Sequence, residues 1–153
     1  MSVLVVLLGV VGSSAAADLR YAYSGVEVLP TDKSFDGLWD ALEQAVADSG
    51  LVVVTRASAS RGAASRGVTI PGNVVIGVFR NDFAVRMLQA SVAAGIEAPL
   101  RFYLVENTDG TATLVYQRPT AVFSPYGSDE LDEMARELDV LFAQIAERAT
   151  AGR

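Results

Sequence analysis

Residues 101–117 read RFYLVENTDGTATLVYQ, and this stretch decides the fold class because it predicts two neighbouring antiparallel strands. Residues 101–106 and 111–117 are rich in aromatic and β-branched side chains, which favour strands. The four residues between them, Asn-Thr-Asp-Gly, have the composition of a tight turn. The sequence therefore predicts a β-hairpin over 101–117.

Three further strands are predicted upstream of the hairpin. Residues 19–28 alternate between apolar and polar or small side chains, and the strand is expected to bulge at Gly25 and to end at Pro30. Residues 51–54 form a short β-branched run that is typical of a buried strand, and residues 74–79 form another. Residues 55–72 are rich in Ser, Ala, Gly and Arg and predict a long loop with room for a short helix at 59–65.

Three helices are predicted from apolar residues at helical spacing behind a capping residue. Ser34 caps the first, whose apolar face comprises Phe35, Leu38, Trp39, Leu42 and Val46. Asn81 is expected to cap the second helix, over 81–94, which Gly95 ends. Ser128 caps the last, after a loop over 119–127, and acidic residues in its first turn suit the helix dipole.

The predicted order is β-α-β-β-α-β-β-α, which indicates an α/β protein built as an α+β two-layer sandwich. One sheet with all helices on one face would bury every apolar stripe described above. The two β-α-β units predict right-handed crossovers, and hence a mixed sheet. We expect one domain over residues 18–153.

Residues 1–17 have the layout of an export signal. An apolar run over 3–11 is followed by small residues and by Ala15-Ala16-Ala17, which predicts cleavage after Ala17. The run is too short to span a bilayer, which takes about 20 apolar residues. We therefore expect a secreted or periplasmic protein without a membrane span in its mature form; the alternative is that this run is a buried first strand.

The composition excludes several classes of chemistry. The chain contains no cysteine and no histidine, so thiolate nucleophiles, Cys/His zinc sites and imidazole-based catalysis are ruled out. The net charge of −6 argues against nucleic acid as a partner. We expect no cofactor, no metal site and no catalytic residue.

Three small groups of residues are candidates for ligand binding. Arg56, Arg61 and Arg66 lie among Ser and Gly, where guanidinium and backbone N–H groups could hold an anion, although a solvated loop has the same composition. Arg80 and Asn81 lie where a strand meets a helix, and Arg101 begins a later strand; exposed charges beside a capping Asn are the simpler interpretation. Aromatic residues on neighbouring strands could line a groove for an apolar ligand or pack as core pairs, and these are Tyr21, Tyr23, Tyr103 and Tyr116.

Residues 52–126 resemble the family called domain of unknown function 302. The resemblance rests on the order and spacing of several short segments: Thr55-Arg56, a segment ending at Gly67, and residues 74–79, 87–90, 98–101, 102–106 and 116–119. It implies the same α/β layout and no assigned activity. Family members often carry an Asp-His pair where this chain has Ser58 and Ala59.

Three functions remain open at this point. The leading hypothesis is a non-enzymatic module that binds a small molecule or a protein partner through an edge strand or the arginine loop. The second is an enzyme without His or Cys, a hydrolase or isomerase that uses carboxylate and Arg groups converging in one pocket. The third is a structural envelope protein that self-associates, as a homodimer, through its sheet.

Overall fold

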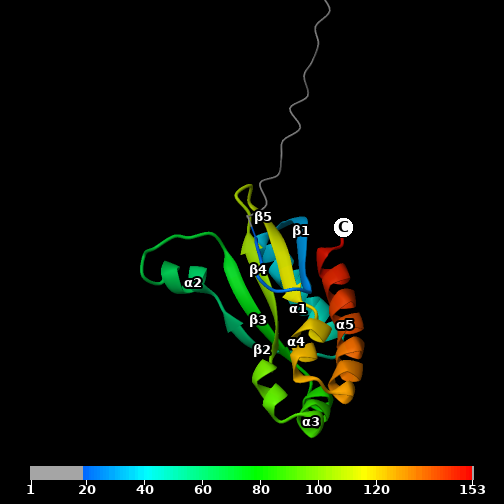
Figure 1. Ribbon diagram of the computed structural model, residues 1–153. Helices are drawn as coiled ribbons and strands as arrows, with labels where there is room; N and C mark the ends of the chain where they lie inside the picture. The colour runs from blue at the N-terminus through cyan, green and yellow to red at the C-terminus, as the bar shows by residue number, and fades with distance from the viewer. Residues whose placement is uncertain (1–18, 153) are drawn as a thin grey trace, which may run out of the picture.

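The computed structural model describes residues 19–152, so the predicted export signal lies outside the described residues. In this range the chain forms a five-stranded sheet in the order β1 (Val26–Ser34), β5 (Thr111–Gln117), β4 (Leu100–Glu106), β3 (Asn73–Phe79) and β2 (Val52–Ala57) (Figure 1). The predicted hairpin lies at its centre, where β4 and β5 pair antiparallel around a turn in which Gly110 has a φ of +83°.

All four strand pairs are antiparallel, so the expectation of a mixed sheet is wrong, whereas the α+β class is confirmed. Parallel neighbours need a connection that returns the chain along the whole strand. Instead, α3 (Asn81–Ala90) and the 3-10 helix η1 (Ala93–Glu97) lie at one end of the sheet and lead β3 into its antiparallel neighbour β4 (Figure 1). The helix α1 (Phe35–Asp48) joins β1 to β2, which are opposite edges and never pair.

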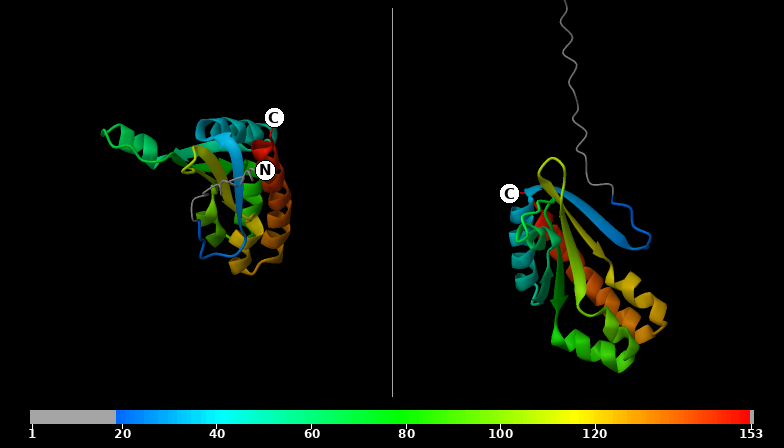
Figure 2. Two further views of the ribbon diagram at one scale, coloured as in Figure 1. Left: turned by 90° about the horizontal axis from the view of Figure 1, so that it is seen from above. Right: turned by 90° about the vertical axis from the view of Figure 1, so that its left-hand side faces the viewer.

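The core lies between the sheet and two helices, α1 and α5 (Asp129–Thr150), which pack side by side on one face (Figure 2). Phe102 of β4 stacks on Phe142 of α5, with ring centroids 4.6 Å apart. Alternate residues of the central strands face this core, and they are Val74, Ile76, Val78, Phe102, Leu104, Ala112, Leu114 and Tyr116. The side chains between them therefore face the opposite side of the sheet.

Two of the three predicted helix caps are present. The hydroxyls of Ser34 and Ser128 accept hydrogen bonds from the backbone N–H groups of the third helical residues, Gly37 and Leu131. The expectation for Asn81 is wrong, because the helix already includes Asn81 and its N-cap is Arg80. α3 also stops at Ala90 rather than at 94, since Ser91 is extended and the chain continues as η1.

The first strand is displaced from its predicted position. β1 begins at Val26, after a turn at Gly25, and runs through Pro30 to Ser34. Proline does not end it because β1 is an edge strand, which pairs only with β5 and tolerates a missing N–H. A register shift follows Pro30, and the Thr31 hydroxyl donates to the carbonyl of Ala112 at 2.7 Å.

Two other segments differ from the predictions. β2 is not buried: it is the other edge of the sheet, and Val52 and Val54 are 60% and 47% exposed. The predicted loop 119–127 is instead helical, as α4 (Pro119–Phe123) and the 3-10 helix η2 (Ser124–Tyr126). The short helix within the loop 55–72 is confirmed as α2 (Ala59–Ala64).

Candidate functional site

A groove of about 260 Å³ lies on the face of the sheet opposite α1 and α5. Its floor is a row of side chains in register across β3, β4 and β5, in which Tyr103 lies between Val75 and Val115. These residues alternate with the core residues of the same strands, so they point away from the helices. The floor is apolar, apart from one phenol.

The segment before β1 forms one wall of the groove with Tyr21 and Tyr23. Gly25 anchors this segment: its φ is +74°, its carbonyl accepts from the Arg118 N–H at 2.8 Å, and its Cα lies against the Ala121 side chain. Burial and the nearby Tyr103 phenol raise the pKa of Tyr21, so its hydroxyl is a neutral hydrogen-bond donor at pH 7.

The polar groups of the groove lie in the next row of the sheet. Arg101 is in register with Gly77 of β3, and Gln117 and Glu97 complete this side. The Tyr126 hydroxyl donates to the Glu97 carboxylate at 2.8 Å, a contact that raises the pKa of Tyr126. The Arg101 side chain is exposed and has no ion-pair partner among residues 19–152.

The predicted aromatic groove is therefore present, but the ring of Tyr116 does not point into it. Tyr116 lies at the border of the groove, while its ring faces the core and contacts Phe102 and Phe142 at centroid distances of 5.5 and 5.8 Å. Burial, followed by the nearby Glu27 carboxylate, raises the pKa of Tyr116. The alternation of side chains along β4 and β5 could have predicted this difference, because Tyr103 and Tyr116 face opposite sides of the sheet.

Two of the three arginines in the 55–72 segment come together, on α1. Arg56 donates twice to Glu43, at 2.6 and 2.8 Å, and the Arg61 guanidinium lies 3.9 Å from the centre of the Trp39 ring. The hydrogen bond from Arg56 is the main cause of a lowered pKa for Glu43. Both guanidinium groups thus have partners within the chain, while Arg66 is exposed beyond them.

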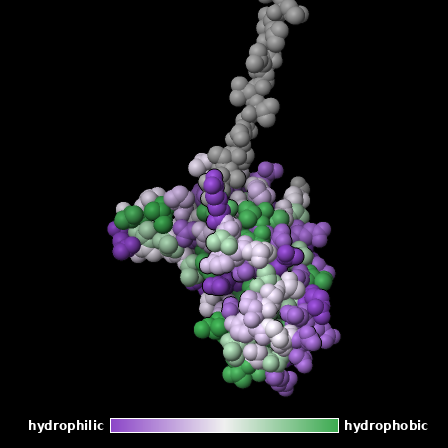
Figure 3. Space-filling view, viewed as in Figure 1, coloured by the Kyte–Doolittle hydropathy of each residue, from purple (hydrophilic) through white to green (hydrophobic). Residues whose placement is uncertain are grey.

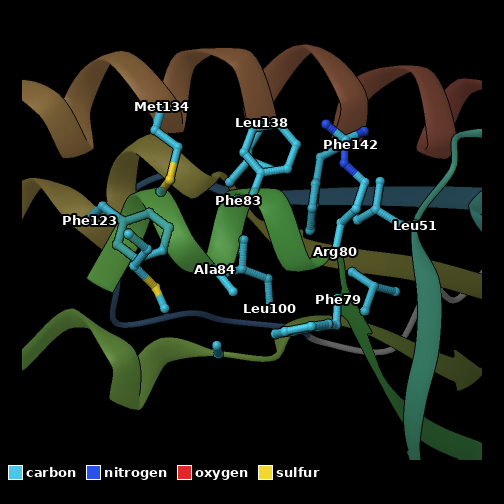
Figure 4. A pocket seen from close by; sticks show the side chains of 13 residues that line it. Leu51, Phe79, Arg80, Phe83, Ala84, Leu100, Phe123, Met134, Leu138 and Phe142 are labelled. Atoms are coloured by element: carbon cyan, nitrogen blue, oxygen red, sulfur yellow. The ribbon is translucent and has the colours of Figure 1, made fainter. Parts of the chain in front are cut away.

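Arg80 and Arg101 line different cavities. Arg80 donates to Asp82 at 2.7 and 3.0 Å and lies 4.2 Å from the centre of the Phe83 ring. It borders a small apolar cavity of about 40 Å³ between α3 and α5, where Leu138 and Met134 face it (Figure 4). That volume has room for only a few water molecules, so this cavity is a packing gap rather than a ligand site.

The described residues contain no cluster of acidic side chains that could hold a metal ion. Among residues 19–152, no helix is both long and apolar enough to cross a membrane. Sequence reasoning missed two polar contributors to the groove, Glu97 and Gln117, because neither lies in the groups of residues that suggested ligand binding.

The fold places the chain in the class of small α+β domains that have an antiparallel sheet with helices on one face. The family model described as "Domain of unknown function DUF302" matches residues 27–149. The chain therefore belongs to the DUF302 family, and the resemblance noted in the sequence is confirmed.

A solved structure with the same fold is described as an uncharacterized conserved protein DUF302 from Bacillus stearothermophilus. The two superpose with a TM-score of 0.74 at 17% sequence identity, over 82% of this chain and 98% of the other. At that identity the likeness establishes the fold alone. No curated protein matches the chain.

Proposed function

We propose that this protein is a non-enzymatic module that binds a small amphipathic anion in the groove formed by Tyr21, Tyr23 and Tyr103. The observation that carries the proposal is the position of Arg101, a guanidinium without an ion-pair partner in residues 19–152, beside an apolar floor with a tyrosine wall. An aromatic or acyl body would lie on the floor, and its carboxylate, sulfonate or phosphate would bind Arg101.

The physical properties of the groove favour this class of ligand. Its volume of about 260 Å³ is close to the lower end of ligand sites, which begin at about 300 Å³. Tyrosine rings offer a large contact area and a hydroxyl that donates or accepts hydrogen bonds. Arginine binds planar anions through two parallel hydrogen bonds, which are stronger than neutral ones.

The alternative, an enzyme that uses two carboxylates and an arginine, has less support. The groove contains a single acid, Glu97, within the described chain, and that carboxylate already accepts a hydrogen bond from Tyr126. We also infer that any role the family assigns to an Asp-His pair is missing here, because the chain has no histidine.

We propose in addition that the protein is exported and that cleavage after Ala17 produces the mature chain. Cleavage there would make Asp18, three residues before Tyr21 in the sequence, the new N-terminus. The signal layout of residues 1–17 supports export, and the net charge of −6 agrees with a partner other than nucleic acid.

The binding proposal is tested with a defined aromatic anion. Titration of the purified protein with 3-phenylpropanoate, followed by NMR of the protein, should shift the signals of Tyr103 and Val115, whereas the neutral amide of the same acid should bind more weakly. Arg101→Gln should weaken binding about tenfold, the effect of losing roughly 1.4 kcal/mol of charge-assisted hydrogen bonding. Arg66→Gln, on an exposed segment away from the groove, is the control and should bind normally.

The outcomes separate the hypotheses. If the anion and the amide bind equally, or if Arg101→Gln binds as well as the parent, Arg101 does not recognise the ligand. If neither compound shifts groove signals at millimolar concentration, the groove does not bind small aromatic anions and the proposal fails.

A further inference from the structure

The two edges of the sheet are protected to different degrees. β1 carries Pro30 and Lys33, both of which discourage a further strand from pairing. A register shift occurs in each edge strand, after Pro30 in β1 and between Val53 and Thr55 in β2, so it does not distinguish them. β2 reads VVVTRA and contains neither proline nor lysine. Its one charged side chain, Arg56, is held by Glu43 on the helix side of the sheet. The β2 edge is therefore the one that can accept another strand.

An arm extends beyond this same edge. We use this name for residues 58–72, which contain α2 and project away from the body past β2 (Figures 1 and 2). Most of the arm is exposed, including the apolar side chains of Val68 (49%) and Ile70 (40%). It carries two arginines and no acid, in a chain whose net charge is −6. Figure 3 shows hydrophobic and hydrophilic residues next to each other on the arm.

A shallow groove of about 530 Å³ runs between the end of α1 and the beginning of β2. Apolar side chains form most of its surface, namely Val46, Ala47, Leu51, Val52 and Val53. Glu43 and Arg56 border it and form an ion pair with each other, and Asp48 lies in the last turn of α1. The groove is thus apolar with one further acid, Asp48, nearby, whereas the arm is apolar with basic groups.

We propose that β2 and the arm form an interface with a second copy of this chain. A twofold axis would pair the two β2 strands antiparallel and extend both sheets into one. Antiparallel pairing places the C-terminal end of each β2, where the arm begins, beside the N-terminal end of the other β2, where the apolar groove begins. The arm of each copy then lies over the groove of the other, as a self-complementary contact requires.

Charge and area both favour a second copy as the occupant. The arm is basic and Asp48 lies near the groove, so the two halves of the contact are complementary in charge, whereas Glu43 is already paired with Arg56. A six-residue strand alone is too small for a stable interface, which usually buries about 1,200–2,000 Å². Two exchanged arms with exposed Val68 and Ile70 would supply the missing apolar area.

Sedimentation velocity at two concentrations tests this interface, with protein purified after expression of the full chain. We expect a dimer at about 50 μM, a typical concentration for such measurements. Val52→Lys places a charge on the free edge and should give a monomer with unchanged circular dichroism. Val68→Asp combined with Ile70→Asp should weaken the dimer at least tenfold. Val92→Lys, at a side chain 79% exposed on the far end of the sheet, is the matched control and should remain dimeric.

Hydrogen exchange keeps the test decisive if Val52→Lys does not fold. In the unmodified protein, the amides of β2 should become more protected as concentration rises, while those of β1 should not change. A monomer at all concentrations overturns the proposal. So does a dimer that tolerates both the edge and the arm variants, or one whose β2 amides exchange at a rate independent of concentration.

Discussion

Gly25 shows how one backbone position shapes the groove. Its φ of +74° is in the left-handed region, which L side chains rarely adopt, and a Cβ atom there would collide with the side chain of Ala121. The turn at this residue directs the preceding segment, with Tyr21 and Tyr23, along the wall of the groove. The chain therefore relies on a glycine outside the sheet to complete its candidate site.

We predict that Gly25→Ala destabilises the protein and also weakens binding of 3-phenylpropanoate. The left-handed conformation alone costs an alanine about 1 kcal/mol, and the collision with Ala121 adds to that. Gly110→Ala is the matched control, because its φ of +83° is equally strained but, among residues 19–152, no atom lies within 4 Å of the added Cβ. Urea unfolding should show the larger loss for Gly25→Ala, and equal losses with normal binding would disprove the role of the Ala121 contact.

The Glu43 carboxylate links α1 to Arg56 of β2 and gives stability a pH dependence. Its pKa is lowered in the folded protein, first by the hydrogen bond from Arg56, so the folded state stabilises the charged form. That contribution is present above the unfolded pKa, near 4.5, and is lost as the pH falls through the lower folded value.

We predict that Glu43→Gln lowers the melting temperature at pH 7 and has a progressively smaller effect below about pH 4.5, the ordinary pKa of a glutamate. The loss at pH 7 should stay below about 1 kcal/mol, because the pair is partly exposed and water screens it. Thermal melts from pH 7 to pH 3 measure the difference. A penalty that stays constant across this range would mean that Glu43 acts through packing instead of charge.

For the helices and strands, the sequence predicts the type of each element better than its place in the sheet or its exposure to solvent. The hairpin and the three longer helices are found because tight-turn composition and helical spacing depend on local chemistry. The run over 51–54 was expected to be buried, yet β2 is an edge strand, because a β-branched run is compatible with either place. The 119–127 segment was expected to be a loop, and its helical turns become apparent only where Phe123 packs against α5.

Two of the three helix starts with a predicted capping residue, at Ser128 and Asn81, give a direct comparison. We predict that Ser128→Ala costs about 1 kcal/mol, the usual loss on removing a hydroxyl cap, because the Ser128 side chain accepts from the Leu131 N–H. Asn81→Ala should cost less than about 0.5 kcal/mol, since Asn81 lies inside α3 and does not cap it. Chemical denaturation of both variants checks this; equal losses would indicate that Asn81 also acts as a cap in solution.

At the scale of the whole molecule, topology decides what the sequence could not. No local feature of the sequence distinguishes a helix that crosses over to a parallel strand from one that leads to the opposite edge of the sheet. For this reason a mixed sheet was predicted, whereas the sheet is antiparallel. The same pairing brings Arg101 into register with Gly77 and separates it from Arg80. The aromatic groove was foreseen because its tyrosines lie on predicted strands, whereas the arm contact with Trp39 depends on long-range packing.

The proposed export has consequences for the whole chain, and it predicts the mass of the mature protein. Expressed with its own N-terminus in a secretion-competent bacterium, the protein should be recovered from the exported fraction with an intact mass that begins at Asp18. Ala17→Arg should retain the leader, because signal cleavage requires a small residue at that position. The control is Ala151→Arg, because Ala151 is exposed and tolerates a long charged side chain. The buried Ala63 would not be a suitable position for a control. An intact mass that begins at Met1, in protein that stays with the cytoplasmic fraction, would show that residues 1–17 are not a cleaved signal.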